Sequence, residues 1–219
     1  MSDLKQAIKQ NYIKCVQDPS YFINQYCTIQ HPQRGKIKFK LYPFQYEVLN
    51  EYQSHDYNVI LKSRQLGIST LSAAYSLWLM LFQNDKNVLC IATTKDTAKN
   101  LVTKVRIMYD GLPVWLKTQI VENNKLSLIF KNGSQIKAIA SNESAGRSEA
   151  LSLLILDEAA FIDKIDTIWT AAQQTLATGG RCLAISTPNG VGNWFHKTWI
   201  DAKDGLNKFN TVKLHWSAH

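Results

Sequence analysis

Apolar, strand-like runs alternate with helical runs from Asn58 to the end of the chain, and this alternation restricts the fold more than any other feature of the sequence. Strands that are joined by helices form a mostly parallel sheet, which helices cover on both faces. The predicted fold class is therefore α/β. Strands are predicted within 58–63, 87–94, 152–161, 181–190 and 209–216, and helices within 69–84, 95–112, 166–180 and 192–205.

Two regions depart from the alternation. Residues 125–141 contain two strand-like runs around Lys131–Asn132–Gly133, a turn sequence that predicts a β-hairpin. The first 57 residues begin with a polar, helix-prone segment. A strand-like stretch follows, and we expect its charged face in solvent; the charged residues are Arg34, Lys36, Lys38 and Lys40.

Length and charge limit the classes of protein and of partner. The chain has 219 residues, of which 45% are hydrophobic, so it can bury a full core. An excess of 25 Lys+Arg over 17 Asp+Glu favours a phosphate-rich partner, although many soluble proteins are equally basic. No apolar signal segment opens the chain, so we expect no membrane. The four cysteines form no C-x-x-C pair and are predicted to be buried thiols.

The stretch LKSRQLGIST at 61–70 has the outline of a phosphate-binding loop, G-x-x-x-x-G-K-[ST], without its lysine. Gly67 matches the second glycine and Ser69 the metal-binding hydroxyl, whereas Ile68 stands where the lysine belongs. Lys62 stands where the first glycine belongs. The loop joins a predicted strand to a predicted helix, where backbone N–H groups favour an anion. Alone, it is compatible with a nucleotide site or with an ordinary strand–turn–helix.

A second element raises the odds of a nucleotide site. Apolar residues 153–156 lead directly into Asp157 and Glu158. Two carboxylates at the end of a buried strand are costly unless they serve a cation or a proton transfer. In phosphate-loop enzymes the Asp holds Mg²⁺ and the following Glu polarises the attacking water. The two elements together predict a site for ATP and Mg²⁺.

Three stretches in this order, KSRQLGIST, LLILDEAAF and AISTPNG, resemble the ATPase domain of the large terminase subunit of tailed bacteriophages, most of all the contractile-tailed type. The resemblance covers residues from about 20 to 219. It implies a P-loop NTPase of the RecA/ASCE-like class, with residues 1–40 as an N-terminal extension packed on the core and 41–219 as the ATPase domain. The cofactors implied are ATP and Mg²⁺.

The family packages double-stranded DNA into empty procapsids, and the resemblance implies the same partners here. These are double-stranded DNA, the viral portal protein, the small terminase subunit and further copies of the chain in a ring, with a monomer expected in isolation. The implied location is the host cytoplasm, on the procapsid and not in the mature virion. Large terminases usually carry a nuclease domain as well. We expect none in this chain, because no third carboxylate on an apolar strand joins Asp157 and Glu158.

The resemblance also assigns roles to the loop. Several terminases carry their functional lysine at the place of Lys62, and a flexible four-carbon stem can reach the phosphates from either side. Ile68 then becomes a packing residue. Arg64 is a second phosphate ligand or a structural arginine. Ser69, or Thr70 in its stead, holds the metal with Asp157.

Two further motifs match the family. LYPFQYEVL resembles the adenine-recognition motif, in which Gln45 reads the base and Tyr42 or Phe44 packs beside the ring. AISTPNG resembles the coupling motif, whose hydroxyl residues sense the γ-phosphate unless they only cap a turn. The full set of nucleotide contacts so implied is Gln45, Lys62, Ser63, Arg64, Gln65, Leu66, Gly67, Ile68, Ser69, Thr70, Ser186 and Thr187.

The polar stretch 141–152 contains Arg147, which the family's pattern makes an arginine finger for the γ-phosphate, with a solvated loop arginine as the alternative. Glu158, Lys62, Arg64 and Arg147 are thus the predicted catalytic residues. Thr94, Lys95 and Lys99 either touch DNA or form a solvated helix start.

Two other functions compete with the packaging motor. A superfamily-two helicase-like ATPase needs a second lobe, and residues 191–219 are too few to build one. A non-hydrolysing nucleotide- or DNA-binding module has no reason to retain Glu158. The packaging motor is the preferred interpretation.

Overall fold

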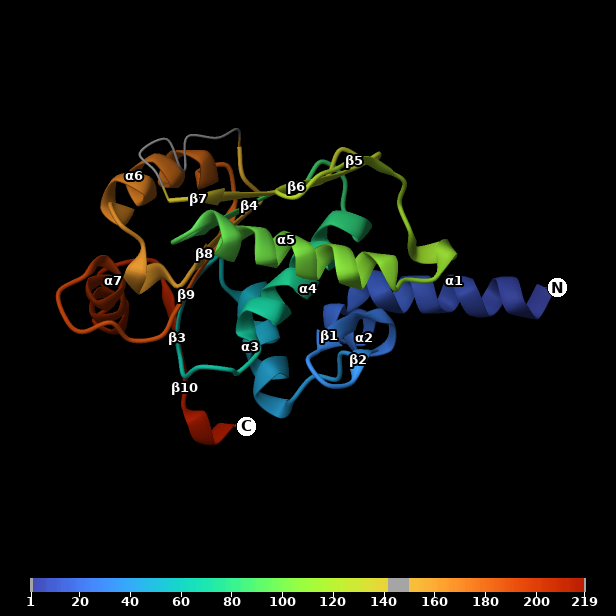
Figure 1. Ribbon diagram of the computed structural model, residues 1–219, viewed down its shortest axis with the longest axis horizontal. Helices are drawn as coiled ribbons and strands as arrows, with labels where there is room; N and C mark the ends of the chain where they lie inside the picture. The colour runs from blue at the N-terminus through green and yellow to red at the C-terminus, as the bar shows by residue number, and fades with distance from the viewer. Residues whose placement is uncertain (1, 142–149, 219) are drawn as a thin grey trace.

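The computed structural model describes residues 2–141 and 150–218. Figure 1 shows a twisted central sheet with helices on either side. The sheet has eight strands in the order β10-β3-β9-β8-β4-β7-β6-β5. They span Tyr57–Lys62 (β3), Asn87–Ala92 (β4), Ile120–Asn123 (β5), Ser127–Phe130 (β6), Gln135–Ala140 (β7), Leu153–Asp157 (β8), Arg181–Ser186 (β9) and Asn210–Leu214 (β10).

All neighbouring strands from β10 to β7 are parallel, and only β6 and β5 pair antiparallel at the far edge. The predicted mostly parallel α/β sheet is confirmed, as is the hairpin of β6 and β7 around Gly133. Strand β5 was not predicted, because it is short and mostly exposed and so shows no clear apolar alternation.

Helices cover both faces of the sheet, as predicted (Figure 1). On one face lie α3 (Pro43–Ser54), α4 (Ile68–Phe82) and α5 (Lys95–Asp110), and on the other lie α6 (Ile165–Leu176) and α7 (Trp194–Lys203). Side chains of a strand point alternately to the two faces. In β8, accordingly, Leu153 and Ile155 join the core under α4 and α5, whereas Leu154 and Leu156 join the core under α6 and α7.

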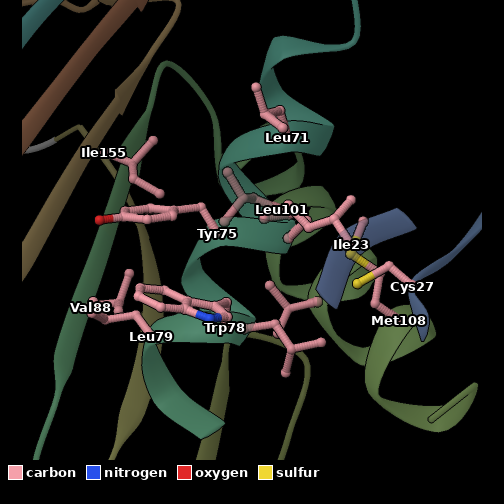
Figure 2. Packing of buried hydrophobic residues seen from close by; sticks show 14 of the residues in the cluster. Ile23, Cys27, Leu71, Tyr75, Trp78, Leu79, Val88, Leu101, Met108 and Ile155 are labelled. Carbon is pink, nitrogen blue, oxygen red and sulfur yellow. The ribbon is translucent and has the colours of Figure 1, made fainter. Parts of the chain in front are cut away.

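Helix α4 is the most deeply buried helix of the described chain. In Figure 2 its side chains Leu71, Tyr75, Trp78 and Leu79 lie among residues from the sheet, from α5 and from α2 with its C-cap. A helix that is apolar all round is fixed on every side by its neighbours. Its N-terminus, where the predicted phosphate loop ends, therefore has a rigid support.

The N-terminal region consists of α1 (Ser2–Gln17), α2 (Pro19–Tyr26) and an antiparallel ribbon of β1 (Thr28–His31) and β2 (Gly35–Lys38). The indole Nε1 of Trp78 donates to the Cys15 carbonyl at 2.7 Å, which ties α1 to α4. Lys36 and Lys38 are exposed, so the charged strand face is confirmed. Its partner β1 was not predicted. The division into 1–40 and 41–219 stays a prediction.

All four cysteines are buried and unpaired, as predicted. Within residues 2–141 and 150–218, no helix has both the length and the apolar character needed to cross a membrane.

Candidate functional site

The predicted loop and the predicted carboxylates meet at one edge of the sheet. Strand β3 ends at Lys62 and β8 ends at Asp157, and both pair in parallel with β9, which lies between them. Parallel strands place their carboxyl ends at the same edge, and open α/β sheets bind ligands there. The strand β9 between them fits the predicted P-loop NTPase fold of the RecA/ASCE-like class.

The loop after β3 has the backbone geometry of an anion-binding turn. Gly67 is the N-cap of α4 with φ 71°, and Gln65 is also left-handed, at φ 63°. Helix α4 begins at Ile68, so Ser69 lies in its first turn. The Ser63 amide donates to the Leu214 carbonyl at 3.1 Å, which fastens the start of the loop to β10.

A cavity of about 270 Å³ lies over this loop. Its lining residues are Lys62, Gln65, Leu66, Gly67, Ile68, Ser69, Thr70 and Lys104. Ile68 is only 1% exposed, as expected of a packing residue. Arg64 is exposed and does not line the cavity, and no described residue forms an ion pair or hydrogen bond with it. Larger cavities occur elsewhere, but they lack the loop and its lysine.

Lys62, which is buried, and Glu158, which is half-buried, form an ion pair in which Lys62 Nζ donates to Glu158 Oε1 at 2.8 Å. The other carboxylate oxygen accepts from the Thr187 amide at 3.2 Å and from its hydroxyl at 3.3 Å. Burial alone would raise the pKa of Glu158, but the hydrogen bonds from Lys62 and Thr187 outweigh it and lower the pKa overall. Glu158 is therefore an ionised carboxylate at neutral pH, held at both oxygens.

Ser69 and Asp157 form the second pair, in which Ser69 Oγ donates to Asp157 Oδ1 at 3.0 Å. Burial raises the pKa of Asp157, and repulsion from Glu158 adds to it, against the Ser69 hydrogen bond and the nearby lysines. A hydroxyl and a carboxylate are oxygen donors of the kind that Mg²⁺ prefers. Within residues 2–141 and 150–218 no cluster of three His, Cys, Asp or Glu side chains could hold a metal ion. The pair thus fits Mg²⁺ that takes its other ligands from water and phosphate.

Gln45 is placed beside the loop, but both ends of its amide are already bonded to the chain. Its Oε1 accepts from the Tyr42 amide at 3.1 Å and its Nε2 donates to the Leu66 carbonyl at 3.0 Å. Gln45 is 2% exposed. It therefore braces the loop from the start of α3, and its contact with adenine stays a prediction. Phe44 and Tyr42 stack with ring centroids 5.9 Å apart.

The end of β9 supports the turn that carries Glu158. Ser186 Oγ accepts from the Ala160 amide at 3.1 Å, and Asn189 Nδ2 donates to the Ala160 carbonyl at 3.0 Å. These contacts fix the short 3₁₀ turn Ala159–Phe161 (η2). Ser186 is fully buried and faces this turn, whereas Thr187 reaches Glu158 directly. Their sensing of a γ-phosphate stays a prediction.

Lys104 is the cavity residue that sequence reasoning missed. It is half-buried on α5, in the i, i+3, i+4, i+7 pattern formed with the buried residues Leu101, Val105 and Met108. A lysine on the apolar face of a helix is the signal that could have found it. Burial lowers the pKa of Lys104, although the nearby Asp157 charge raises it.

The remaining predicted residues lie away from the loop or outside the described chain. Thr94 is the N-cap of α5, where its hydroxyl accepts from the Thr97 amide at 3.2 Å, and Lys95 is exposed. With Lys99 they stay candidates for DNA contact. Arg147 lies outside the described residues, so its role as a finger stays a prediction.

Comparison with known proteins gives one family. The family model of the terminase large subunit, T4likevirus-type, N-terminal, matches residues 59–216. The large terminase ATPase domain of Thermus phage P74-26 superposes with a TM-score of 0.66 at 22% identity, over 82% of this chain and 83% of that one. A large terminase from a thermophilic bacteriophage, solved in complex with ADP, gives a TM-score of 0.61 at 16% identity, over 78% and 44%.

A curated relative extends beyond the matched region. The Mu-like prophage FluMu protein gp28 of Haemophilus influenzae is 23% identical over 160 residues, which are 68% of this chain and 31% of that protein. The chain thus spans about a third of the length of this relative.

Proposed function

The chain belongs to the T4likevirus-type family of terminase large subunits, and from this membership we propose that it is the ATPase motor domain of a viral DNA-packaging terminase. It hydrolyses ATP to ADP and phosphate and uses the free energy to move double-stranded DNA into a procapsid. One observation carries the proposal: an ammonium, a hydroxyl and two carboxylates converge at the carboxyl edge of the sheet, in pairs 2.8 and 3.0 Å apart.

The loop supplies the binding of the phosphates. Backbone N–H groups at the N-terminus of α4 point toward an anion, and Gly67 lets it approach closely. Lys62 brings an ammonium from the end of β3. Ser69 and Asp157 would hold Mg²⁺, which supplies neutralisation of phosphate charge when it is bound. The thermophilic phage terminase that was solved in complex with ADP supports nucleotide binding by a chain of this fold.

Glu158 supplies the base. Its Oε1 is bonded to Lys62, and its Oε2 is held by Thr187. Phosphate oxygens in the cavity compete for the Lys62 ammonium, which frees Oε1 to accept a proton from water while Thr187 keeps the carboxylate oriented. The chain's own ion pair thereby links occupation of the loop to exposure of the base.

The partners of the whole protein belong to the same proposal. They are double-stranded DNA, the portal protein, the small terminase subunit and neighbouring copies in a ring, with Arg147 as the finger that one copy offers to the next. The docked location on the procapsid follows from these partners.

The test is Mg²⁺-dependent release of phosphate from ATP, measured with and without duplex DNA at several protein concentrations. Glu158→Gln should still bind ATP but lose at least about a hundredfold in turnover, because the amide cannot accept the proton. Glu47→Gln, on the exposed side of α3, is the matched control and should behave as wild type. No hydrolysis by the wild type under any of these conditions, or normal hydrolysis by Glu158→Gln, would contradict the proposal.

A further inference from the structure

The two lysines of the cavity differ in their partners. Lys62 is bonded to Glu158, so its charge is already compensated within the chain. Lys104 forms no ion pair with any carboxylate in the described part of the chain. It feels the charge of Asp157 through space and is repelled by Lys62. Lys104 is therefore the ammonium of this cavity that is not committed to a partner within residues 2–141 and 150–218.

The position of Lys104 is costly if it is only structural. Leu101, Val105 and Met108, on the same face of α5, are at most 2% exposed and belong to the core against α4. An ammonium that is partly withdrawn from water loses hydration, and a nearby anion offsets the loss; for Lys104 the described chain supplies only the through-space charge of Asp157, without an ion pair. Most lysines avoid this cost by extending their ammonium into solvent. Lys104 instead lines the cavity beside Ser69 and Thr70.

The loop itself lacks the cation that its sequence pattern normally provides. Ile68 occupies the lysine position of the pattern and packs into the core at 1% exposure. Lys62 approaches from the end of β3, which is the side of Glu158. No residue of the loop supplies an ammonium on the side of α5. On the α5 side the cavity is lined by Lys104, which belongs to a helix far from the loop in sequence.

We propose that Lys104 is a second phosphate-binding lysine, which contacts the triphosphate of the nucleotide from the α5 side and replaces the missing loop lysine. This inference rests on the proposed function, because it names a further binding residue of the same site. Lys62 then has two roles, because it binds phosphate and also determines whether Glu158 Oε1 is free to accept a proton. Lys104 contributes to phosphate binding alone.

The test is equilibrium binding of Mg²⁺-ATPγS to the full chain by calorimetry, together with the kcat and KM of ATP hydrolysis. Lys104→Met should weaken ATPγS binding by about tenfold or more, as expected for the loss of one charge-assisted hydrogen bond. KM should rise while kcat changes little, and Lys104→Arg should restore most of the affinity. Lys203→Met removes an exposed lysine of α7 and should bind as wild type.

The outcomes separate this inference from the function on which it rests. Wild-type protein that does not bind ATPγS would overturn the proposed function and this inference with it. Wild-type affinity in Lys104→Met, or a loss of affinity that Lys104→Arg does not restore, would overturn only the assignment of Lys104. Thermal melting checks the fold of each variant, and Lys104→Gln serves as the neutral variant should Lys104→Met not fold.

Discussion

The turns after β3 and β8 meet at the same edge of the sheet and both contain left-handed residues, but they achieve this conformation differently. After β3 the turn contains Gln65 at φ 63° and ends in Gly67 at φ 71°, where the absence of a Cβ removes the steric cost. After β8 the left-handed residue is Glu158 at φ 55°. For a residue with a Cβ this conformation costs about 1–2 kcal/mol.

The turns also differ in what holds the left-handed residue that has a Cβ, Gln65 in the first turn and Glu158 in the second. In the first turn the Gln65 side chain is exposed, and Gln45 and β10 fasten the loop on either side of it, through Leu66 and Ser63. Glu158 is instead held by Lys62, by Thr187 and by the contacts of β9 with Ala160. Backbone strain persists where surrounding contacts over-determine it, and such places tend to be functional. Of the two left-handed residues with a Cβ, Gln65 and Glu158, the one whose own side chain is held by such contacts is the proposed base.

The largest expected effect comes from replacing Lys62, whose ion pair with Glu158 joins the two turns. Lys62→Ala should reduce ATP hydrolysis by at least about a hundredfold, because it removes both the phosphate-binding charge and the partner of Glu158. The measurement is the steady-state rate of phosphate release at saturating ATP.

Ile68→Val is the comparison variant for Lys62→Ala. It changes the residue at the usual lysine position but keeps its packing, so its rate should fall far less. Hydrolysis by Lys62→Ala at the wild-type rate would show that the cation comes from elsewhere, and Arg64 would be the next residue to replace.

The predictable part of the site consists of residues that follow strands directly. Lys62, Asp157 and Glu158 end or follow β3 and β8, so the strand pattern alone places them at one edge. The main strands and helices were predictable for the same reason, since long apolar runs carry a clear period. Within the described chain, the sequence left open mainly what depends on packing between distant elements.

Three features illustrate this limit. The spacing along α5 places Lys104 on the apolar face of the helix, but it reaches the cavity only because α5 packs on α4, which the sequence does not specify. The bond from the Gln45 amide to the loop was not predicted, because hydrogen-bond partners depend on where α3 lies, whereas the contact of Gln45 with adenine stays a prediction. Strands β1 and β5 pair at exposed edges, where polar residues conceal the alternation.

The next effect in size tests the glycine of the first turn. An ideal Cβ at Gly67 would lie 2.8 Å from Gln45 Nε2, so Gly67→Ala has both a strained φ and a close contact. Gly205 has the same φ of 71° with nothing within 4 Å of its Cβ position. Gly205→Ala should therefore lose only the conformational part, about 1–2 kcal/mol.

Gly67→Ala should lower the free energy of unfolding more than Gly205→Ala does, in urea titrations of both variants. It should also weaken ATP binding, because the loop must shift away from Gln45, whereas Gly205→Ala should bind ATP normally. Equal losses of stability would show that Gln45 yields without cost and does not brace the loop.

The smallest effect tests the strain of the second turn. Glu158→Gly and Glu158→Ala both remove the carboxylate and leave Lys62 without its partner, so both should be inactive. They differ in the cost of the left-handed backbone, which only alanine bears, and in the greater freedom of glycine in the unfolded chain. We expect Glu158→Gly to be the more stable by about 0.5–1 kcal/mol, the balance of these two terms.

At Glu47, within helix α3, the same pair of substitutions should give the opposite order by about 1 kcal/mol, because glycine disfavours a helix interior. The sign of the difference is thus the readout in urea titrations, and it does not depend on the activity of either variant. If alanine were the more stable residue at both positions, the turn after β8 would bear no strain, and its left-handed backbone would need no support from Lys62, Thr187 and β9. The expected result, with glycine the more stable residue at position 158 and alanine at position 47, would mean that the chain keeps a glutamate where glycine would be more stable. Such a loss of stability is expected where a residue serves as a base.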